Sequence, residues 1–172
     1  MAVPSDPSTG EDRVQTVTYG TTAFREATEA LATSDVPATG ACIVFHNGSR
    51  DDRQQALASI TPYATGSVHQ FRMPSLLSER RMQTQNALRK SFDHAAEEGA
   101  LLYFDATDAL FTHVHEDPLD GEGEEEPTAI EYFFDRIEAY PDPVVLGLQQ
   151  SAHVDAARTR GAHLVVRFEA TA

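Results

Sequence analysis

The residue best placed to do chemistry is Asp105, an aspartate that ends the apolar run ALLYFD (100–105). An apolar run of this length without alternation predicts a strand covered on both faces, as in a parallel sheet. Such a strand carries its last residue to the carboxyl edge of the sheet, where open α/β folds bind their ligands. An aspartate at this edge is typical of nucleotide hydrolases, in which it helps to hold Mg²⁺. Asp105 is therefore a candidate Mg²⁺ ligand, although many α/β strands end in an aspartate.

A second candidate is the pair His113 and His115, which is followed by Glu116 and Asp117. Imidazole and carboxylate ligands suit Zn²⁺ or Ni²⁺, so this segment is an alternative metal site. A histidine pair in an acidic loop is more simply explained as solvated polar surface. The single cysteine, Cys42, lies in an apolar run and is expected to be a small buried side chain rather than a catalytic thiol.

The elements that must position Asp105 alternate between strands and helices. The strand candidates lie at 41–46, 67–73, 100–105, 143–148 and 163–168. The helix candidates lie at 19–33, 51–62, 79–98 and 128–139. This alternation predicts an α/β fold with a parallel sheet and helices on both faces. Residues 1–18 are polar and are expected to form a flexible arm, and residues 19–172 are expected to form a single domain.

The composition restricts the environment and the partners. Acidic residues outnumber basic ones 27 to 13, which gives a net charge of −14. Lys90 is the only lysine, and acidic surfaces with few lysines suit a cytoplasm at high salt, so we expect a halophilic source. The sequence contains no basic stripe that would favour nucleic acid. It has neither an apolar run long enough for a membrane span nor a signal peptide, so we expect no membrane partner and a cytoplasmic location.

Three segments resemble the AAA+ ATPases and come in the order that this family shows. The stretch NALRKSFDHAAEEGALLYFDATDALF (86–111) is similar to the family's Walker B strand and its surroundings. The segment EYFFDRIEAYPDPVVLGLQQ (131–150) is similar to the family's sensor helix and strand, and VDAARTRGAHLVVRFE (154–169) is similar to the next segment of the family. The resemblance covers roughly residues 40–168 and implies a three-layer αβα fold of the P-loop NTPase type. The motifs are also similar in style to those of AAA+ ATPases that accompany contractile injection systems.

The Walker A loop, in which glycines and a lysine hold the phosphates, differs from the family pattern. The matching segment HNGSRDDRQ (46–54) contains one glycine, Gly48, and Arg53 stands at the lysine position. Asp51 and Asp52 would face the phosphates and repel them, where a helix N-terminus should attract them. The resemblance therefore implies a site with weak affinity for nucleotides.

Positions that act on water or on a neighbouring subunit's phosphates differ as well. Ala106 replaces the glutamate that activates water, so the role of general base is vacant, and Asp108 is a displaced candidate for it. Gln149 takes the place of the sensor asparagine, and Arg160 takes that of the arginine finger. The chain stops at Ala172, so the resemblance implies a domain without the family's C-terminal helical lid.

Together these differences predict an AAA+-like domain without catalysis, which acts as a protein-binding, assembly or regulatory module. We expect no cofactor, and a partner that is an AAA+ ATPase subunit, a larger assembly or a second copy of the chain. The alternative is a divergent ATP-binding protein or ATPase, in which Gly48, Arg53 and Asp105 contact ATP and Mg²⁺. In that alternative Asp105, Gln149 and Arg160 carry the catalysis. A third hypothesis is a sensor that binds nucleotide without hydrolysing it.

Overall fold

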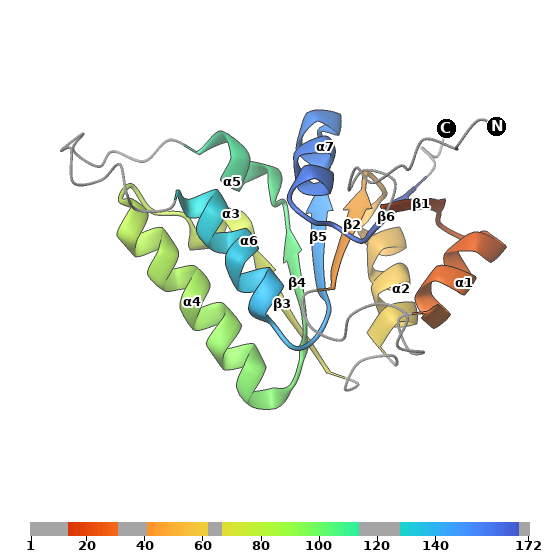
Figure 1. Cartoon of the computed structure of the whole chain (residues 1–172), viewed down its shortest axis with the longest axis horizontal. Helices are drawn as coiled ribbons and strands as arrows, with labels where there is room; N and C mark the ends of the chain where they lie inside the picture. The colour runs from red at the N-terminus through yellow and green to blue at the C-terminus, as the bar shows by residue number, and fades with distance from the viewer. Residues whose placement is uncertain (1–13, 31–40, 62–66, 114–127, 169–172) are drawn as a thin grey trace, which may run out of the picture.

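Six parallel strands form one sheet in the order β1-β6-β2-β5-β4-β3 (Figure 1). The computed structural model describes residues 14–30, 41–61, 67–113 and 128–168. The strands are β1 (Gln15–Thr18), β2 (Cys42–His46), β3 (Val68–Arg72), β4 (Leu101–Asp105), β5 (Val144–Leu148) and β6 (Leu164–Arg167). The helices of these ranges are α1 (Thr22–Ala30), α2 (Arg50–Ile60), α3 (Met73–Leu76), α4 (Arg81–Glu98), α5 (Asp108–Thr112), α6 (Ala129–Ala139) and α7 (Ser151–Thr159). The predicted α/β fold with a parallel sheet is confirmed.

Helices cover both faces of the sheet, so the fold has three layers (Figure 1). Helices α1 and α2 pack on one face, against a cluster that includes Ile43 and Phe45. Helices α3 to α7 pack on the other face, against a cluster that includes Val44 and Leu146. Successive residues of a strand point to opposite faces, so the central strands need apolar side chains at nearly every position. The apolar runs of β2, β4 and β5 meet this need, and their ends are fixed in space as a result.

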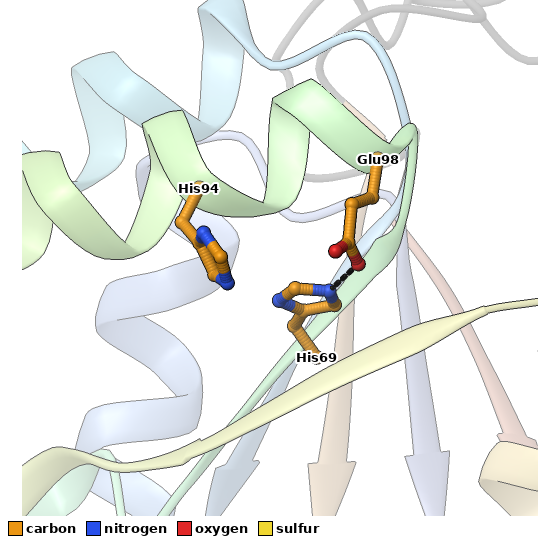
Figure 2. Close-up of side chains that lie close together, drawn as sticks. All are labelled: His69, His94 and Glu98. Carbon is orange, nitrogen blue, oxygen red and sulfur yellow. Dashed lines mark hydrogen bonds and ion pairs between the residues drawn. The ribbon is translucent and has the colours of Figure 1, made fainter.

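The edge strand β3 presents different side chains to the two faces. Gln70 bonds to a glutamine of α2 on one face. Phe71 packs against the core cluster beneath α4 on the other. His69 is two residues from Phe71 and therefore shares its face, where it points toward α4 (Figure 2). This strand therefore contributes side chains to two separate places in the molecule.

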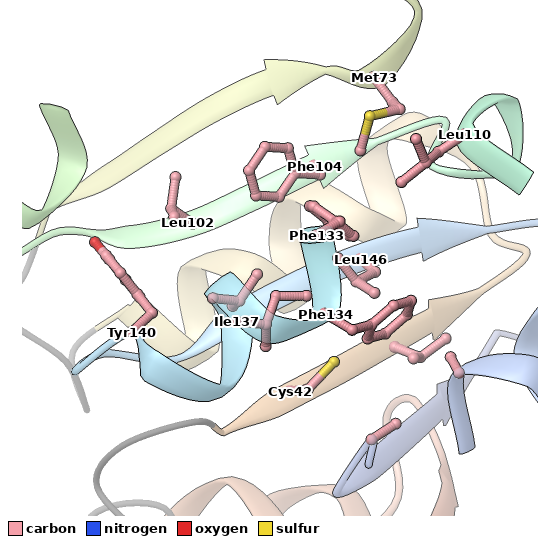
Figure 3. Packing of buried hydrophobic residues seen from close by; sticks show 14 of the residues in the cluster. Cys42, Met73, Leu102, Phe104, Leu110, Phe133, Phe134, Ile137, Tyr140 and Leu146 are labelled. Atoms are coloured by element: carbon pink, nitrogen blue, oxygen red, sulfur yellow. The ribbon is translucent and has the colours of Figure 1, made fainter. Parts of the chain in front are cut away.

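Aromatic rings fix β4 beneath the helices that cover it (Figure 3). Phe133 of α6 is fully buried and meets Phe104 of β4 edge to face, with ring centroids 5.0 Å apart. Phe92 of α4 lies 5.9 Å from the Phe133 ring centroid and 5.5 Å from that of Phe104. The Tyr140 hydroxyl donates a hydrogen bond to the carbonyl of Ala100, just before β4 begins. These contacts hold the strand that ends in the candidate ligand residue.

One expectation from the sequence is wrong in detail. The predicted flexible arm, residues 1–18, includes Gln15–Thr18, and these residues form β1, which pairs in parallel with β6. Only Val17 of this strand is buried, so the continuous apolar run that marks the central strands is missing here. Parallel pairing with β6 holds β1 in place. Met82 of α4 differs from Leu88 and Phe92 of the same helix, since its side chain is 57% exposed while theirs are buried.

The single cysteine should make the stability of the protein depend on alkaline pH. Cys42 is buried, and burial raises the pKa of its thiol from 9.0 to about 12. The unfolded chain therefore ionises above pH 9 while the folded chain does not, so the thiol's contribution is complete below that pH and is lost as the pH rises. We expect this group to lower the free energy of unfolding by about 1.4 kcal/mol between about pH 8 and about pH 10.

Urea unfolding of wild type and Cys42→Ala across this pH range measures the contribution of the thiol. The variant loses packing at every pH, so only the slope of stability against pH isolates the ionisation. We expect a shallower slope in Cys42→Ala. Equal slopes in the two proteins would show that the thiol does not resist ionisation.

Candidate functional site

Three loops meet at the carboxyl edge of the sheet, after β2, β4 and β5. Strand β5 lies between β2 and β4, and hydrogen bonds tie both neighbouring loops to its end. The Asn47 N–H donates to the carbonyl of Leu148 over 3.0 Å, and the Thr107 N–H donates to that of Gly147 over 2.9 Å. The loop after β2 and the loop after β4 are therefore held on either side of β5, at the edge where open α/β folds bind their ligands.

Arg53 links the loop after β2 to the end of β4. One guanidinium nitrogen donates to the carbonyl of Gly48 over 2.7 Å. A second guanidinium nitrogen lies 3.7 Å from Oδ1 of Asp105. The two side chains are 13% and 33% exposed, so the contact is largely shielded from water. The structure thus brings together the three residues that the sequence singles out as ligand-binding candidates.

The carboxylate of Asp105 has further partners in its own strand and at the residue that follows it. Its Oδ1 accepts hydrogen bonds from the Ala106 N–H over 2.9 Å and from the Tyr103 hydroxyl over 3.2 Å. Burial, with a smaller contribution from the charge of Asp105, raises the pKa of Tyr103 to about 12, so this hydroxyl remains a donor. A Cβ atom at Gly147 would lie 3.1 Å from Oδ1, so the neighbouring strand leaves just enough room for this arrangement.

The N-terminus of α2 is capped by the protein itself. The Ser49 hydroxyl accepts a hydrogen bond from the Asp52 N–H over 3.1 Å, and Asp51 and Asp52 lie in the first turn. Carboxylates in this position interact favourably with the helix dipole. The donors and the positive potential that a helix N-terminus can offer an anion are thus partly used within the chain.

A pocket of about 390 Å³ opens beside the Arg53–Asp105 contact. Its lining consists of Arg50, Arg53, Gln54, Gln70, Phe71, Arg72, Tyr103 and Asp105. Three of the eight lining residues are arginines, and one is acidic. The pocket therefore offers a concentration of positive charge in a chain whose net charge is −14.

Two of these arginines are missed by reasoning from the sequence. Arg72 ends β3 and Arg50 begins α2, so both lie at the same edge of the sheet as Asp105. Arg72 could have been found from its position near the end of the strand candidate 67–73, because Asp105 is identified from its position at the end of the candidate 100–105. Arg50 could have been found from its position at the start of the helix that follows β2.

Asp108 caps the turn between β5 and α7 instead of facing the pocket. Its two carboxylate oxygens accept hydrogen bonds from the Gln149 N–H, over 2.8 Å, and from the Gln150 N–H, over 3.0 Å. Oδ1 also lies 2.6 Å from Nδ1 of His153, in the first turn of α7. The side chain of Gln149 is exposed, and it is not among the described residues that line the pocket. The structure thus places Asp108 and Gln149 side by side but does not bring them to Arg53.

The remaining candidates lie elsewhere. Arg160 is exposed at the end of α7, with its guanidinium carbon 5.7 Å from the ring centroid of Phe134. Nε2 of His113 donates a hydrogen bond to the carbonyl of Ser78 over 2.6 Å. His115, its expected partner in a metal site, lies outside the described residues.

Sequence comparison identifies no relative for this site, because no protein-family model and no curated protein matches the chain. Within the described ranges, none of the helices combines the length and the apolar character that crossing a membrane requires.

Proposed function

We propose that this chain is a non-catalytic AAA+-like module that acts by binding a protein partner. The main support is the position of Arg53, the residue at the Walker lysine position. A phosphate-binding lysine must be free to meet the β- and γ-phosphates of a nucleotide. The guanidinium of Arg53 is instead engaged by a carbonyl of its own loop and lies close to the candidate Mg²⁺ ligand, Asp105.

The other parts of the site support the same proposal. A triphosphate at the start of α2 would compete with the Ser49 cap and would approach the carboxylates of Asp51 and Asp52. A water molecule near Asp105 would meet Ala106, which cannot accept a proton. The carboxylate of Asp108 is occupied by two backbone N–H groups, so it is poorly placed to serve as a substitute base.

The charge of the pocket suggests what the partner supplies. Arg50, Arg53 and Arg72 line one recess, where Asp105 is the single acidic residue among those lining it. Guanidinium groups bind carboxylates with paired, charge-assisted hydrogen bonds. We therefore propose that an aspartate or glutamate of the partner enters this pocket. The partner is an AAA+ ATPase subunit, a larger assembly or a second copy of this acidic chain.

Calorimetry with ATP and with ADP, in the presence of Mg²⁺ and molar KCl, tests the nucleotide side of the proposal. We expect no binding heat at millimolar nucleotide. Arg53→Lys restores the residue that the AAA+ family has at this position. We expect it to remain silent as well, because Asp51 and Asp52 are still present.

The divergent ATP-binding alternative is favoured by one observation, since three arginines beside a carboxylate also suit a phosphate chain and its Mg²⁺. Binding by wild type that requires Mg²⁺ and disappears in both Arg53→Ala and Asp105→Ala would establish this alternative. Turnover of ATP by wild type would then be compared with turnover by a Gln149→Ala variant.

Partner binding is tested by affinity purification from the source cells in molar KCl. Wild type, Arg72→Glu and Arg89→Glu serve as matched baits, since Arg89 is an exposed arginine of α4 that does not line the pocket. We expect a partner that is retained by wild type and Arg89→Glu and lost with Arg72→Glu. Sedimentation equilibrium of the same three proteins detects self-assembly. A monomer that retains no partner, or retention that is equal in all three, would refute the proposal.

A further inference from the structure

Two histidines and a glutamate meet between α4 and the edge strand β3, away from the arginine pocket (Figure 2). They are His69, His94 and Glu98, and one potential ligand atom from each lies within 4.8 Å of those of the others. His94 and Glu98 are four residues apart on α4, so they project from the same side of the helix. His69 projects from β3 toward them.

We propose that His69, His94 and Glu98 form a binding site for a divalent transition-metal ion, with Zn²⁺ as the best-suited ion. Two imidazoles and one carboxylate are a ligand set that Zn²⁺ uses in proteins, with water in the fourth tetrahedral position. Imidazole also suits Ni²⁺ and Cu²⁺, whereas Mg²⁺ and Ca²⁺ prefer oxygen ligands.

The three side chains combine a fixed ligand with adjustable ones. The side chain of His69 is 15% exposed, and its ring packs 6.4 Å from that of Phe71 and 5.1 Å from that of His94, measured between centroids. The side chain of Glu98 is 56% exposed, and His94 is exposed as well. The strand therefore holds one imidazole in place while the two helical ligands can move to complete the coordination.

A short contact already joins two of the ligands. Nε2 of His69 lies 2.5 Å from Oε2 of Glu98. Two ligands of one tetrahedral Zn²⁺, each at about 2.0–2.1 Å, lie about 3.3 Å apart, so the metal would replace the shared proton and separate these atoms slightly. The exposed Glu98 side chain can make this small movement.

The carboxylate of Glu98 interacts favourably with positive charge placed beside it. The hydrogen bond from His69, then the charge of His69 and to a smaller extent that of His94, lower the pKa of Glu98 below its usual value. A glutamate with its usual pKa is already ionised at neutral pH, so this exposed carboxylate is available as a ligand. A metal ion would supply the positive charge to this carboxylate while the imidazoles bind it as neutral ligands.

The site differs from the arginine pocket in its place on β3. His69 is the second residue of the strand and points to α4, while Arg72 is the last and lines the pocket. Metal binding would join α4 to the edge strand of the sheet. The expected role is thus to stabilise this side of the fold, independently of what the pocket binds.

Titration of the chelator-treated full-length chain with Zn²⁺ by calorimetry tests the site. We expect one equivalent to bind to wild type. His94→Ala and Glu98→Gln should each weaken this binding at least tenfold, since even the loss of a residue that only supports a ligand costs about 10–100-fold. Glu97→Gln, which makes the same change at the preceding exposed position of α4, should bind as wild type does.

Thermal unfolding gives a second measurement that does not depend on binding heats. Zn²⁺ should raise the melting temperature of wild type and of Glu97→Gln, but not that of His94→Ala, because a ligand of the folded state stabilises it. Melting without metal shows whether His94→Ala is folded. If it is not, Glu98→Gln serves in its place.

A variant in the other histidine segment locates the metal. His115→Ala should bind Zn²⁺ as wild type does. Loss of binding in His115→Ala with retention in His94→Ala would place the metal in that segment and overturn the proposal. An absence of Zn²⁺ binding by wild type would also overturn it and would leave the cluster as an ion pair between α4 and β3.

Discussion

Replacing Gly48 with alanine is expected to lower the free energy of unfolding by about 2–4 kcal/mol. Gly48 has a φ of +90°, which side chains of L-residues rarely adopt. A Cβ atom there would lie 2.7 Å from Cγ of Phe168 and 3.0 Å from its Cβ. Phe168 cannot easily retreat, because its ring is buried against Tyr19 and Phe45, with centroids 5.1 and 5.4 Å away. Backbone strain and overpacking therefore act together.

Gly20→Ala is the matched control for this change. Gly20 has a similar φ of +87°, but a Cβ atom there meets nothing within 4 Å. We expect a loss of about 1 kcal/mol from backbone strain alone. Urea unfolding of both variants measures the difference, which is the cost of the contact with Phe168. Equal losses in the two variants would mean that the loop after β2 can shift to relieve that contact.

A double-mutant cycle with Phe168→Ala identifies the partner in the clash. Removing the ring is itself destabilising, since it leaves a cavity beside Phe45. In this background the contacts with Cγ and Cδ2 are gone and only the 3.0 Å contact with Cβ remains, so Gly48→Ala should cost less than it does in wild type. The cycle thus separates the cost of the backbone conformation at Gly48 from the cost of packing against the Phe168 ring. A rigid loop after β2 would explain why Arg53 stays hydrogen-bonded to the carbonyl of Gly48 and close to Asp105.

The sheet can be predicted directly from the sequence because its central strands are apolar throughout. The predicted strand 100–105 becomes Leu101–Asp105, and the predicted strand 143–148 becomes Val144–Leu148. Strands buried on both faces cannot be mistaken for alternating surface strands. The apolar strands therefore predict the edge of the sheet at which Asp105 lies, whereas the grouping of Gly48 and Arg53 with it comes from the resemblance to AAA+ ATPases.

The elements that the sequence does not reveal lack such a pattern. Strand β1 buries only Val17, and α3 is four residues long with a proline in its first turn. Helix α7 has no side-chain cap of its own and buries only Val154 and Ala157. Each is held by contacts with distant parts of the chain, which spacing within a short segment cannot show.

The histidine–glutamate cluster is hidden for a related reason. The four-residue spacing of His94 and Glu98 is visible in the sequence, but such pairs are common on helix surfaces. The third member, His69, lies 29 residues before Glu98 and belongs to another element. The meeting depends on how α4 lies across β3, and only the packed structure gives that relation.

The Asp108 carboxylate should prove to be a structural cap rather than a base. We expect Asp108→Ala to lower the free energy of unfolding by about 2–3 kcal/mol, because it removes hydrogen bonds to a partly buried charged group. The lost bonds come from the N–H groups of Gln149 and Gln150 and from the ring of His153. That ring also stacks on Phe111 of α5, with centroids 4.7 Å apart, so its orientation depends on both contacts.

Two variants separate the cap from a general effect of charge. Asp155→Ala removes an exposed carboxylate of α7, and we expect a loss within about 0.5 kcal/mol. Asp108→Asn retains one oxygen acceptor and should cost about half as much as Asp108→Ala. Urea unfolding gives these values, and hydrogen exchange should show faster opening of the first turn of α7 in Asp108→Ala.

The same variants distinguish a cap from a substitute base. If Asp108 instead acted as a general base, Asp108→Asn would leave the free energy of unfolding unchanged and would abolish ATP turnover. A cap predicts the reverse, a loss of stability in a protein that has no turnover to lose. Because the N–H groups that Asp108 binds begin just after β5, its loss should also disturb the loop beside Asp105. The residue that resembles a second catalytic acid would then be the one that keeps the edge of the sheet in order.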